Sequence, residues 1–363
     1  MKGELIMHKK LYIPGPVEMS QDTIQSMAKP MIGHRMKEFD ALYASIQTKL
    51  KKVLYTENPV FVFTSSATGV MEGTLRNLCA KRILSCVNGA FSERWHKIAL
   101  DCGLPADNLS VEWGQAITPE LLDAKLKSGD YDLVTVCLNE TSTGIMNPVK
   151  ELAAVVKKYP GVLIAVDAVS AMTGVKIEVD AWGLDVCLAS TQKAFGLPPG
   201  LAVCSVSQAA LDRCATVKGR GYYFDFIEMK KYHDKNQTPA TPAVSLMYGL
   251  DFQLEKMMNE GLDKRFARHK EMSDFTKAWA KKNFALFGDE HYQSITLTTI
   301  ANTKGISVAD LNKELGNRGY HLSNGYGAQL KEKTFRIAHM ADFTVADVKE
   351  LLDQINDILG TTY

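Results

Sequence analysis

Between residues 58 and 206, short apolar runs alternate with longer amphipathic segments, and this alternation is the feature that most constrains the fold. Several of the short runs are apolar at every position, which is typical of strands that helices cover on both faces. Seven runs fit a strand, and they occupy residues 60–63, 83–87, 109–113, 133–138, 162–166, 186–189 and 201–206. Helical periodicity fills intervals between them, at residues 69–80, 91–102, 119–127 and 148–158. We therefore predict an α/β domain with a mostly parallel, seven-stranded sheet.

The pattern changes beyond residue 240. Long helical stretches at residues 242–260 and 262–282 precede strand-like segments at 294–300 and 334–338 and helices that begin near Val308 and Val345. Thr344 is placed to cap the last of these helices. A separate amphipathic helix is predicted over residues 37–54, before the sheet. We expect a large domain over residues 15–255 and a small α+β domain over residues 256–363. The N-terminal residues 1–14 are expected to be part of the small domain.

Charge and composition exclude several classes of protein. Lysine and arginine number 42 and aspartate and glutamate 41, so the net charge of +1 gives no strong field to attract nucleic acid or an acidic membrane. No apolar run approaches the roughly 20 residues of a membrane-spanning helix, and the N-terminus lacks the apolar region of a secretory signal. The seven cysteines include no C-x-x-C pair and the histidines are dispersed, so we expect a cytoplasmic protein with reduced thiols and no metal site.

Ligands of an open α/β sheet bind beyond the carboxyl ends of its strands, so the residues that leave each strand are candidates for a site. The run at 60–63 leads into residues 64–69, a stretch of small and hydroxyl side chains at the start of a helix. The free N–H groups of such a helix start suit a phosphate, although an ordinary N-cap is the simpler explanation of this segment taken alone.

Two charged side chains follow buried strands. Asp167 comes directly after the run at 162–166, where an ionised carboxylate is costly unless it meets a cation, which a protein side chain could also supply. Lys193 follows the run at 186–189 and precedes a loop that two prolines stiffen. A lysine is usually a solvated surface group, but one that loses hydration between a strand and a stiff loop has a lowered pKa and can form a Schiff base.

Two further strand ends complete the set. The run at 133–138 leads into a polar turn that contains Ser142, and the run at 83–87 leads to Phe91, which alone is more simply a core residue. A phosphate cradle, an aromatic face, a hydroxyl, a buried carboxylate and a strand-end lysine match the phosphate, ring, phenolic oxygen, pyridine nitrogen and aldehyde of pyridoxal phosphate. The sequence therefore predicts a site for this cofactor, and it contains neither the dinucleotide fingerprint nor the Walker loop.

Short motifs occur in a fixed order along nearly the whole chain. They are Pro14-Gly15-Pro16, Gly33-His34-Arg35, Ser66-Ala67-Thr68-Gly69 with Glu72, Asn88-Gly89-x-Phe91-Ser92-x-Arg94, Glu140-Thr141-Ser142-Thr143-Gly144, Val166-Asp167-Ala168-Val169-Ser170, Ser190-Thr191-Gln192-Lys193, Thr238-Pro239-Ala240-Thr241-Pro242 and Phe335-Arg336-Ile337-Ala338-His339-Met340. In order and spacing these motifs resemble those of the class V aminotransferases of fold type I. Within that class the chain is most similar to the alanine or serine:glyoxylate (pyruvate) aminotransferases.

The resemblance implies roles for residues around the cofactor ring. Lys193 would be the catalytic residue and would hold pyridoxal phosphate as a Schiff base. Asp167 would pair with the pyridine nitrogen, and Val169 would pack beneath the ring. Phe91, where relatives often have tryptophan, would stack on the opposite face. Ser142 would bond near the phenolic oxygen.

The resemblance also implies how phosphate and substrate are bound. The cofactor phosphate would be held by Ser66, Ala67, Thr68 and Gln192. Thr241 would reach the phosphate of the other subunit, because members of the family are homodimers with shared active sites. Arg336 would bind the α-carboxylate of the substrate through a bidentate pair, and His34 and Arg35 are further candidates for substrate binding.

The reaction implied is a transamination between a small amino acid, alanine or serine, and a 2-oxo acid such as glyoxylate or pyruvate, in a ping-pong sequence through pyridoxamine phosphate. Phosphoserine aminotransferase stays open because His34 and Arg35 could meet a substrate phosphate, and so do the aspartate and aminoethylphosphonate aminotransferases. A cysteine desulfurase is disfavoured by Gln192 and Phe91, which stand where that family has histidine. The intact Lys193 and Asp167 disfavour a non-enzymatic binding protein, and the missing glycine-rich fingerprint disfavours a nicotinamide-dependent oxidoreductase.

Overall fold

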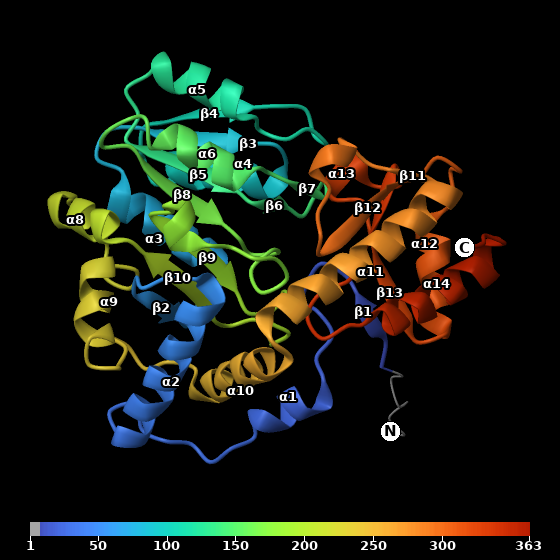
Figure 1. Ribbon diagram of the computed structural model, residues 1–363, viewed down its shortest axis with the longest axis horizontal. Helices are drawn as coiled ribbons and strands as arrows, with labels where there is room; N and C mark the ends of the chain where they lie inside the picture. The colour runs from blue at the N-terminus through green and yellow to red at the C-terminus, as the bar shows by residue number, and fades with distance from the viewer. Residues whose placement is uncertain (1–7) are drawn as a thin grey trace.

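The fold is built on two main sheets. The computed structural model describes residues 8–363, so residues 1–7 of the predicted N-terminal segment lie outside the described residues. The larger sheet has seven strands in the order β2-β10-β9-β8-β5-β3-β4 (Figure 1). In that order the strands are Val60–Phe63, Ala202–Val206, Val186–Ser190, Leu163–Asp167, Leu133–Cys137, Ile83–Val87 and Ala106–Ser110. All neighbours from β9 to β4 pair in parallel, and β10 pairs antiparallel with both β2 and β9. The prediction of a mostly parallel, seven-stranded sheet is confirmed.

Helices cover both faces of this sheet, as the continuous apolar runs require. Alternate strand residues point into two separate cores, so that Val62 and Val166 belong to one and Phe63 and Ala165 to the other. The first core is closed by α2 (Lys37–Leu54), α5 (Pro119–Lys127), α6 (Val149–Val156), α7 (Val179–Trp182) and α10 (Val244–Glu260). The second is closed by α3 (Ala67–Leu78), α4 (Ala90–Asp101), α8 (Gln208–Thr216) and α9 (Phe226–His233).

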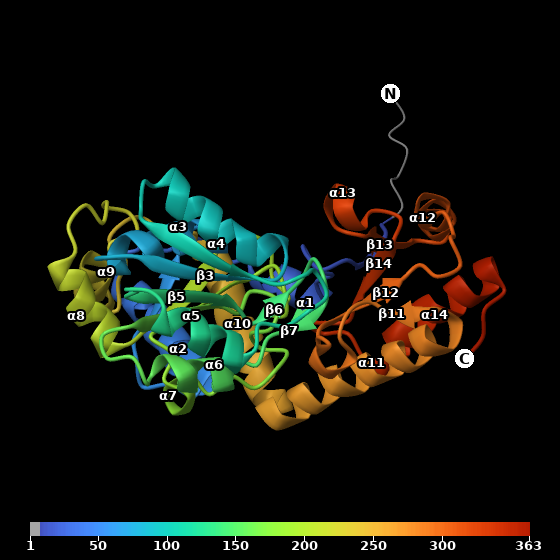
Figure 2. The same cartoon turned by 90° about the horizontal axis from the view of Figure 1, so that it is seen from above.

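The second main sheet is smaller and has five strands in the order β1-β13-β14-β12-β11. These strands are Lys10–Tyr12, Tyr320–Asn324, Thr334–Ala338, Leu297–Ala301 and Ala285–Leu286. The N-terminal strand β1 therefore lies among elements from the C-terminal third of the chain, paired in parallel with β13 (Figure 1). Around this sheet lie α11 (Leu262–Asn283), α12 (Val308–Asn317), α13 (Gly327–Leu330) and α14 (Val345–Leu359), and Figure 2 shows α11 running from the larger sheet's side to the smaller one.

The remaining elements are short. The helix α1 (Gln21–Ser26) lies against α10, and the strands β6 (Asn139–Glu140) and β7 (Ile145–Met146) form a small hairpin beyond β5. A single 3-10 turn, Glu290–Tyr292, precedes β12. Among residues 8–363 no helix is long and apolar enough to cross a membrane, and no three His, Cys, Asp or Glu side chains gather as a metal site would require.

The predicted strand at residues 109–113 is wrong in position, because β4 covers Ala106–Ser110. This strand lies at the edge of the sheet and pairs only with β3, with Ile83 opposite Ala106. An edge strand needs no continuous apolar run, and the middle of β4 contains Asp107, which is partly exposed, and Asn108, which is exposed. The run that we interpreted as a strand shares only Leu109 and Ser110 with β4, and its other residues follow the strand.

Candidate active site

A cavity of about 490 Å³ opens beyond the carboxyl ends of the parallel strands. Its walls come from the ends of β5, β8 and β9 and from the first turns of α3 and α4. The residues that line it are Ser66, Ala67, Thr68, Met71, Phe91, Arg94, Cys137, Asn139, Thr141, Asp167, Val169, Ser190, Gln192 and Lys193. The strand ends singled out from the sequence therefore meet at one place, although Ser142 itself is not in this lining.

The first turn of α3 forms one end of the cavity. Ser66 is the N-cap of this helix, and its side chain makes no capping hydrogen bond. The backbone N–H groups of a first helical turn have no partner within the helix, and the helix dipole favours an anion there. The Nη1 group of Arg94 donates to Thr68 Oγ1 at 3.2 Å, which brings a positive charge to the same end. This end of the cavity suits a phosphate.

Asp167 ends β8 and is almost wholly buried, at 3% exposure. Its Oδ1 accepts a hydrogen bond from the Val169 N–H at 2.8 Å. Burial raises the pKa of Asp167 to about 7, and the negative charge of Glu140 adds to this effect, while the Val169 bond and the charges of Lys193 and Arg94 oppose it. A cation facing Asp167 from within the cavity would therefore stabilise its ionised form.

Lys193 follows β9, and its Nζ donates to the carbonyl oxygen of Pro14. Burial lowers the pKa of Lys193 to about 8, and the charge of Arg336 lowers it as well. Gly15 makes room for this side chain, because a Cβ atom there would lie 2.6 Å from the Lys193 Cδ atom. A lysine in this state has a neutral amine available near neutral pH, as a nucleophile or a base needs.

Arg336 lies in β14 of the small sheet, next to the cavity, with 8% of its surface exposed. Its Nη1 group donates to the Thr141 carbonyl at 3.0 Å, and its Nε and Nη2 groups both donate to the Asn324 carbonyl at 3.2 Å. Within residues 8–363 no carboxylate pairs with it, and burial lowers its pKa to about 10. Its positive charge is therefore fixed in direction and free to bind an anion.

Phe91 and Ser142 both donate hydrogen bonds to the buried carboxylate of Glu140. Phe91 is half-buried, lines the cavity and has the Arg94 guanidinium 4.9 Å from its ring centroid. Ser142 is fully buried, donates from Oγ to Glu140 Oε1 at 2.6 Å and accepts from the Ala90 N–H at 3.1 Å. The predicted contact of Ser142 with a ligand stays a prediction.

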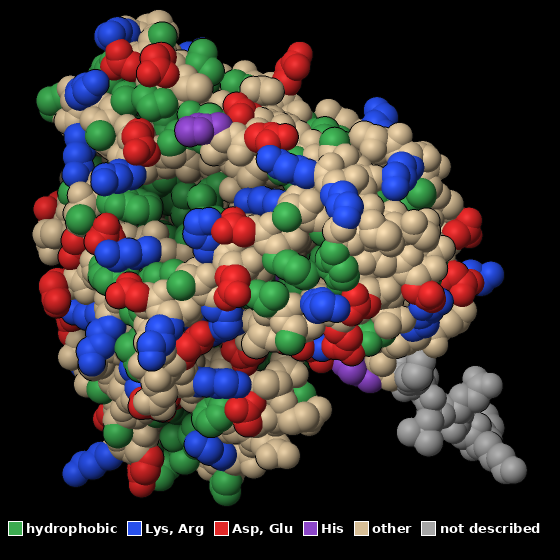
Figure 3. All heavy atoms as spheres, turned by 45° about the vertical axis from the view of Figure 1, so that its right-hand side comes forward, with side chains coloured by type: hydrophobic (Ala, Val, Ile, Leu, Met, Phe, Trp, Pro, Cys, Tyr) green, Lys and Arg blue, Asp and Glu red, His purple; other side chains and the backbone are tan. Residues whose placement is uncertain are grey.

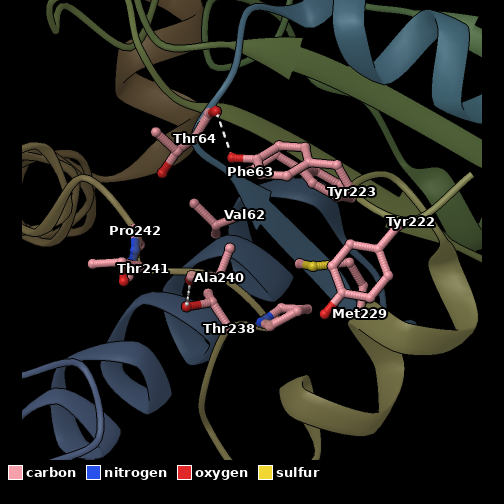
Figure 4. Close-up of a pocket in the computed structure, with 11 residues that line it drawn as sticks. Val62, Phe63, Thr64, Tyr222, Tyr223, Met229, Thr238, Ala240, Thr241 and Pro242 are labelled. Carbon is pink, nitrogen blue, oxygen red and sulfur yellow. Dashed lines mark hydrogen bonds between the residues drawn. The ribbon is translucent and has the colours of Figure 1, made fainter.

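Besides Ser142 and Arg336, which lie next to the cavity, three predicted site residues do not line it. Thr241 is exposed and lines a second pocket, together with Phe63, Tyr222 and others (Figure 4). Arg35 donates to the Thr238 carbonyl at 2.7 Å and to the Pro239 carbonyl at 3.2 Å, so it supports the loop that carries Thr241. His34 precedes it on the same partly exposed segment.

Several cavity residues were not assigned a role from the sequence, namely Met71, Arg94, Cys137, Asn139, Thr141 and Ser190. Arg94 could have been recognised, because a basic residue one helical turn after Phe91 faces the same way. Met71 lies on α3, and the other four residues lie at or just beyond strand ends, where only the fold reveals the direction of a side chain.

The buried polar atoms of the cavity indicate that it is built to hold a ligand. Asn139 Oδ1, Ser190 Oγ and Gln192 Oε1 have no hydrogen-bond partner within the described part of the chain. Native proteins rarely leave such atoms unsatisfied. Together with the helix start, the Lys193 amine and the Asp167 carboxyl, these donors and acceptors fit a molecule with a phosphate, a carbonyl and a ring nitrogen. Pyridoxal phosphate fits this description.

Known proteins match the chain over nearly its whole length. The family model "Aminotransferase class-V" matches residues 18–351. An uncharacterized aminotransferase of Methanocaldococcus jannaschii is 37% identical, over 95% of this chain and 90% of that protein. A serine–glyoxylate aminotransferase of Methylorubrum extorquens is 32% identical, over 92% of this chain and 86% of that protein. The crystal structure of an alanine–glyoxylate aminotransferase from Nostoc sp. superposes with a TM-score of 0.93 at 26% identity, over 99% of this chain and 97% of that one. These matches confirm the predicted fold class.

Proposed function

The chain belongs to the class V aminotransferases, and we propose that it transfers the amino group of a small amino acid, alanine or serine, to a 2-oxo acid such as glyoxylate or pyruvate. The family implies pyridoxal phosphate as cofactor. The observation that carries the proposal is the meeting of a desolvated lysine and a buried carboxylate in one cavity, with the unpaired Arg336 guanidinium bonded to Thr141 in the wall of that cavity. The names of the relatives from Methylorubrum and Nostoc support serine and alanine as donors.

The proposed roles follow from the position of each side chain. Ser66, Ala67, Thr68 and Gln192 would hold the phosphate, Phe91 and Val169 would flank the ring, and Ser142 would lie near its phenolic oxygen. When bound, pyridoxal phosphate withdraws electrons from the α-carbon of an amino acid. The Lys193 amine, with its pKa lowered to about 8, would take the proton from that carbon. Asp167 would hold a proton at the ring nitrogen, and Arg336 would bind the α-carboxylate through two parallel hydrogen bonds.

Separate half-reactions test this assignment. The enzyme loaded with pyridoxal phosphate is mixed with one amino acid at a time, and the loss of its visible absorbance is followed. We expect alanine or serine to remove the absorbance and glyoxylate or pyruvate to restore it, which is the behaviour of a ping-pong enzyme. Discharge by phosphoserine alone, or by aspartate alone, would overturn the proposed donor.

Donors with a second anionic group are the alternative, and Arg94 is the observation that favours them. Its guanidinium lines the cavity and has no carboxylate partner among residues 8–363. If the cofactor phosphate leaves this charge unused, Arg94 could bind the side chain of aspartate, phosphoserine or aminoethylphosphonate. The half-reactions above include these donors, so the same experiment decides between the two.

We also propose a homodimer with shared active sites. Figure 4 shows Thr241 at the edge of a pocket whose walls include the aromatic side chains Phe63, Tyr222 and Tyr223. Tyr222 is 70% exposed, and large aromatic side chains are enriched where proteins associate. A partner seated on this surface would meet Thr241 and the segment that contains His34 and Arg35, which do not line the cavity of their own chain. This arrangement would let Thr241 reach the phosphate in the other subunit.

The proposed place of action is the cytoplasm. All seven cysteines are free and six of them are buried, which suits a reducing compartment. Positive and negative side chains are mixed over the face drawn in Figure 3, in keeping with the net charge of +1. The proposed substrates are accordingly small molecules rather than nucleic acid or membrane lipid.

A further inference from the structure

Glu140 is a fully buried carboxylate beside the cavity that the proposed reaction does not use. It ends the short strand β6, and its side chain faces the first turn of α4. It accepts hydrogen bonds from the backbone N–H groups of Phe91, at 3.2 Å, and Ser92, at 2.8 Å. It also accepts from the Ser92 hydroxyl at 2.8 Å, the Ser142 hydroxyl at 2.6 Å and the Ser142 N–H at 3.1 Å.

No lysine or arginine forms a salt bridge with Glu140 within residues 8–363, so its surroundings differ from those of an ordinary buried ion pair. The N–H groups at the start of α4 and the helix dipole take the place of a cation. Gly89 permits this approach, because a Cβ atom there would lie 2.4 Å from Glu140 Cγ and 2.5 Å from Ser142 Oγ. The carboxylate, the helix start and the Ser142 turn therefore pack as one unit.

This unit connects two walls of the cavity. On one side it fixes the backbone of Phe91, whose ring lines the cavity from α4. On the other side it fixes the turn of Ser142, and the neighbouring Thr141 carbonyl holds the Arg336 guanidinium at 3.0 Å. A shift of Glu140 would thus move the aromatic wall relative to the turn that orients Arg336.

We propose that Glu140 is a positioning residue that sets the Phe91 ring, which would stack on the cofactor ring, relative to the Ser142 turn, which would lie near the phenolic oxygen of the cofactor. The inference rests on the proposed function, since the cofactor is taken to be pyridoxal phosphate. Glu140 itself does not line the cavity, so it acts through the groups that it holds.

The isosteric substitution Glu140→Gln is a sharp test because the groups around the side chain are donors. The amide NH2 of glutamine would face the N–H groups of Phe91 or Ser92, and a backbone N–H cannot turn to accept a hydrogen bond. The size of the side chain is kept, so packing is disturbed little. Glu93→Gln is the matched control, because it removes the same charge from the first turn of the same helix at an exposed position.

The measurements are the dissociation constant of pyridoxal phosphate, from titration of the apoenzyme, and the visible circular dichroism of the bound cofactor, which reports how the ring is held. We expect E140Q to weaken binding on the order of tenfold or more and to change the dichroic band. We expect E93Q to match the wild type in both. A merely structural role would lower thermal stability without changing the band of the cofactor that still binds.

Ser92→Ala keeps the experiment decisive if E140Q does not fold. Ser92 is buried outside the cavity lining and donates to the carboxylate, so its loss should change the same dichroic band by loosening Glu140. An unchanged band and unchanged binding in E140Q, or in S92A where E140Q is unfolded, would overturn the inference alone. A wild-type chain that binds no pyridoxal phosphate would overturn the proposed function and the inference with it.

Discussion

Asp167 and Lys193 are titratable groups whose pKa values move toward neutrality from opposite sides, because both are buried. For Asp167 the folded chain has a pKa of about 7 against 3.8 as the ordinary value. The folded chain therefore binds the proton of the Asp167 carboxyl more tightly than the unfolded chain. Between pH 3.8 and about pH 7 the stability of the apoenzyme falls as the pH rises. The site gives up stability that a bound cation would restore.

Asp167→Asn should accordingly stabilise the apoenzyme. The expected gain in unfolding free energy is at most about 4 kcal/mol above pH 7, and it should vanish below about pH 4, where the wild-type carboxyl is protonated in both states. The same variant should bind pyridoxal phosphate more weakly, because the ring nitrogen loses its charged partner. Urea denaturation of both apoenzymes at pH 8 and pH 4 measures the first effect. A variant less stable than the wild type at pH 8 would contradict this account of Asp167.

Arg336 offers a second test at the scale of single residues. Arg336→Lys keeps the charge but loses the planar pair of donors, so the KM for the amino acid should rise on the order of tenfold, and Arg336→Ala should raise it further. Steady-state kinetics on the preferred donor measures both. Arg318→Lys is the control, because Arg318 pairs on the surface with Asp357 and does not line the cavity. An unchanged KM in Arg336→Ala would exclude the proposed carboxylate contact.

At the scale of elements, the helix α14 shows how a local signal specifies local structure. Thr344 accepts from the Asp347 N–H while the Asp347 carboxylate accepts from the Thr344 N–H, so the predicted cap is present as a capping box. Thr344→Ala should lower the unfolding free energy by about 1 kcal/mol. Thermal unfolding measures this, with the exposed Thr303→Ala as a control that should change little. Equal losses in the two variants would contradict the role of the cap.

Elements with a strong period could be predicted from the sequence, and those that depend on pairing could not. The helices α2 and α5 begin and end where the periodicity predicts, and α14 begins there, because each has one continuous apolar face. The strands β1 and β13 were not predicted. The three residues of β1 form a strand only because they pair with β13, about 300 residues later in the chain. Likewise the direction of Asn139 or Arg94 into the cavity depends on the packing of β6 and α4, which no local pattern contains.

At the scale of the whole molecule, the candidate site combines parts from both sheets. Asp167 ends β8 and Lys193 follows β9 of the large sheet, whereas Arg336 belongs to the small one. The buried side chain of Arg265, on α11, donates to the Ala194 carbonyl at 2.8 Å and to the Thr173 carbonyl at 3.0 Å, and pairs with Asp342 beyond β14 at 3.5 Å. Arg265 therefore connects Ala194, which follows Lys193, to the segment after β14, the strand that contains Arg336.

The shared active site of the proposed dimer can be tested by mixing two defective chains. Lys193→Ala removes the amine from its own site, and Thr241→Glu should place a negative charge beside the phosphate in the other subunit. Each variant alone should be inactive, but a mixed dimer contains one site with both native residues. Refolding the two variants together should therefore restore part of the activity. Recovery no greater than the sum of the separate variants would contradict site sharing.

The central claim is that Lys193 holds the cofactor, and its chemical labelling tests this most directly. The enzyme is loaded with pyridoxal phosphate and treated with borohydride, which reduces a lysine Schiff base to a stable secondary amine, and the modified peptide is identified by mass spectrometry. We predict that the modification lies on Lys193 and that the Lys193→Ala variant carries no modified lysine. A modification on another lysine of the wild type, or none at all, would contradict the account.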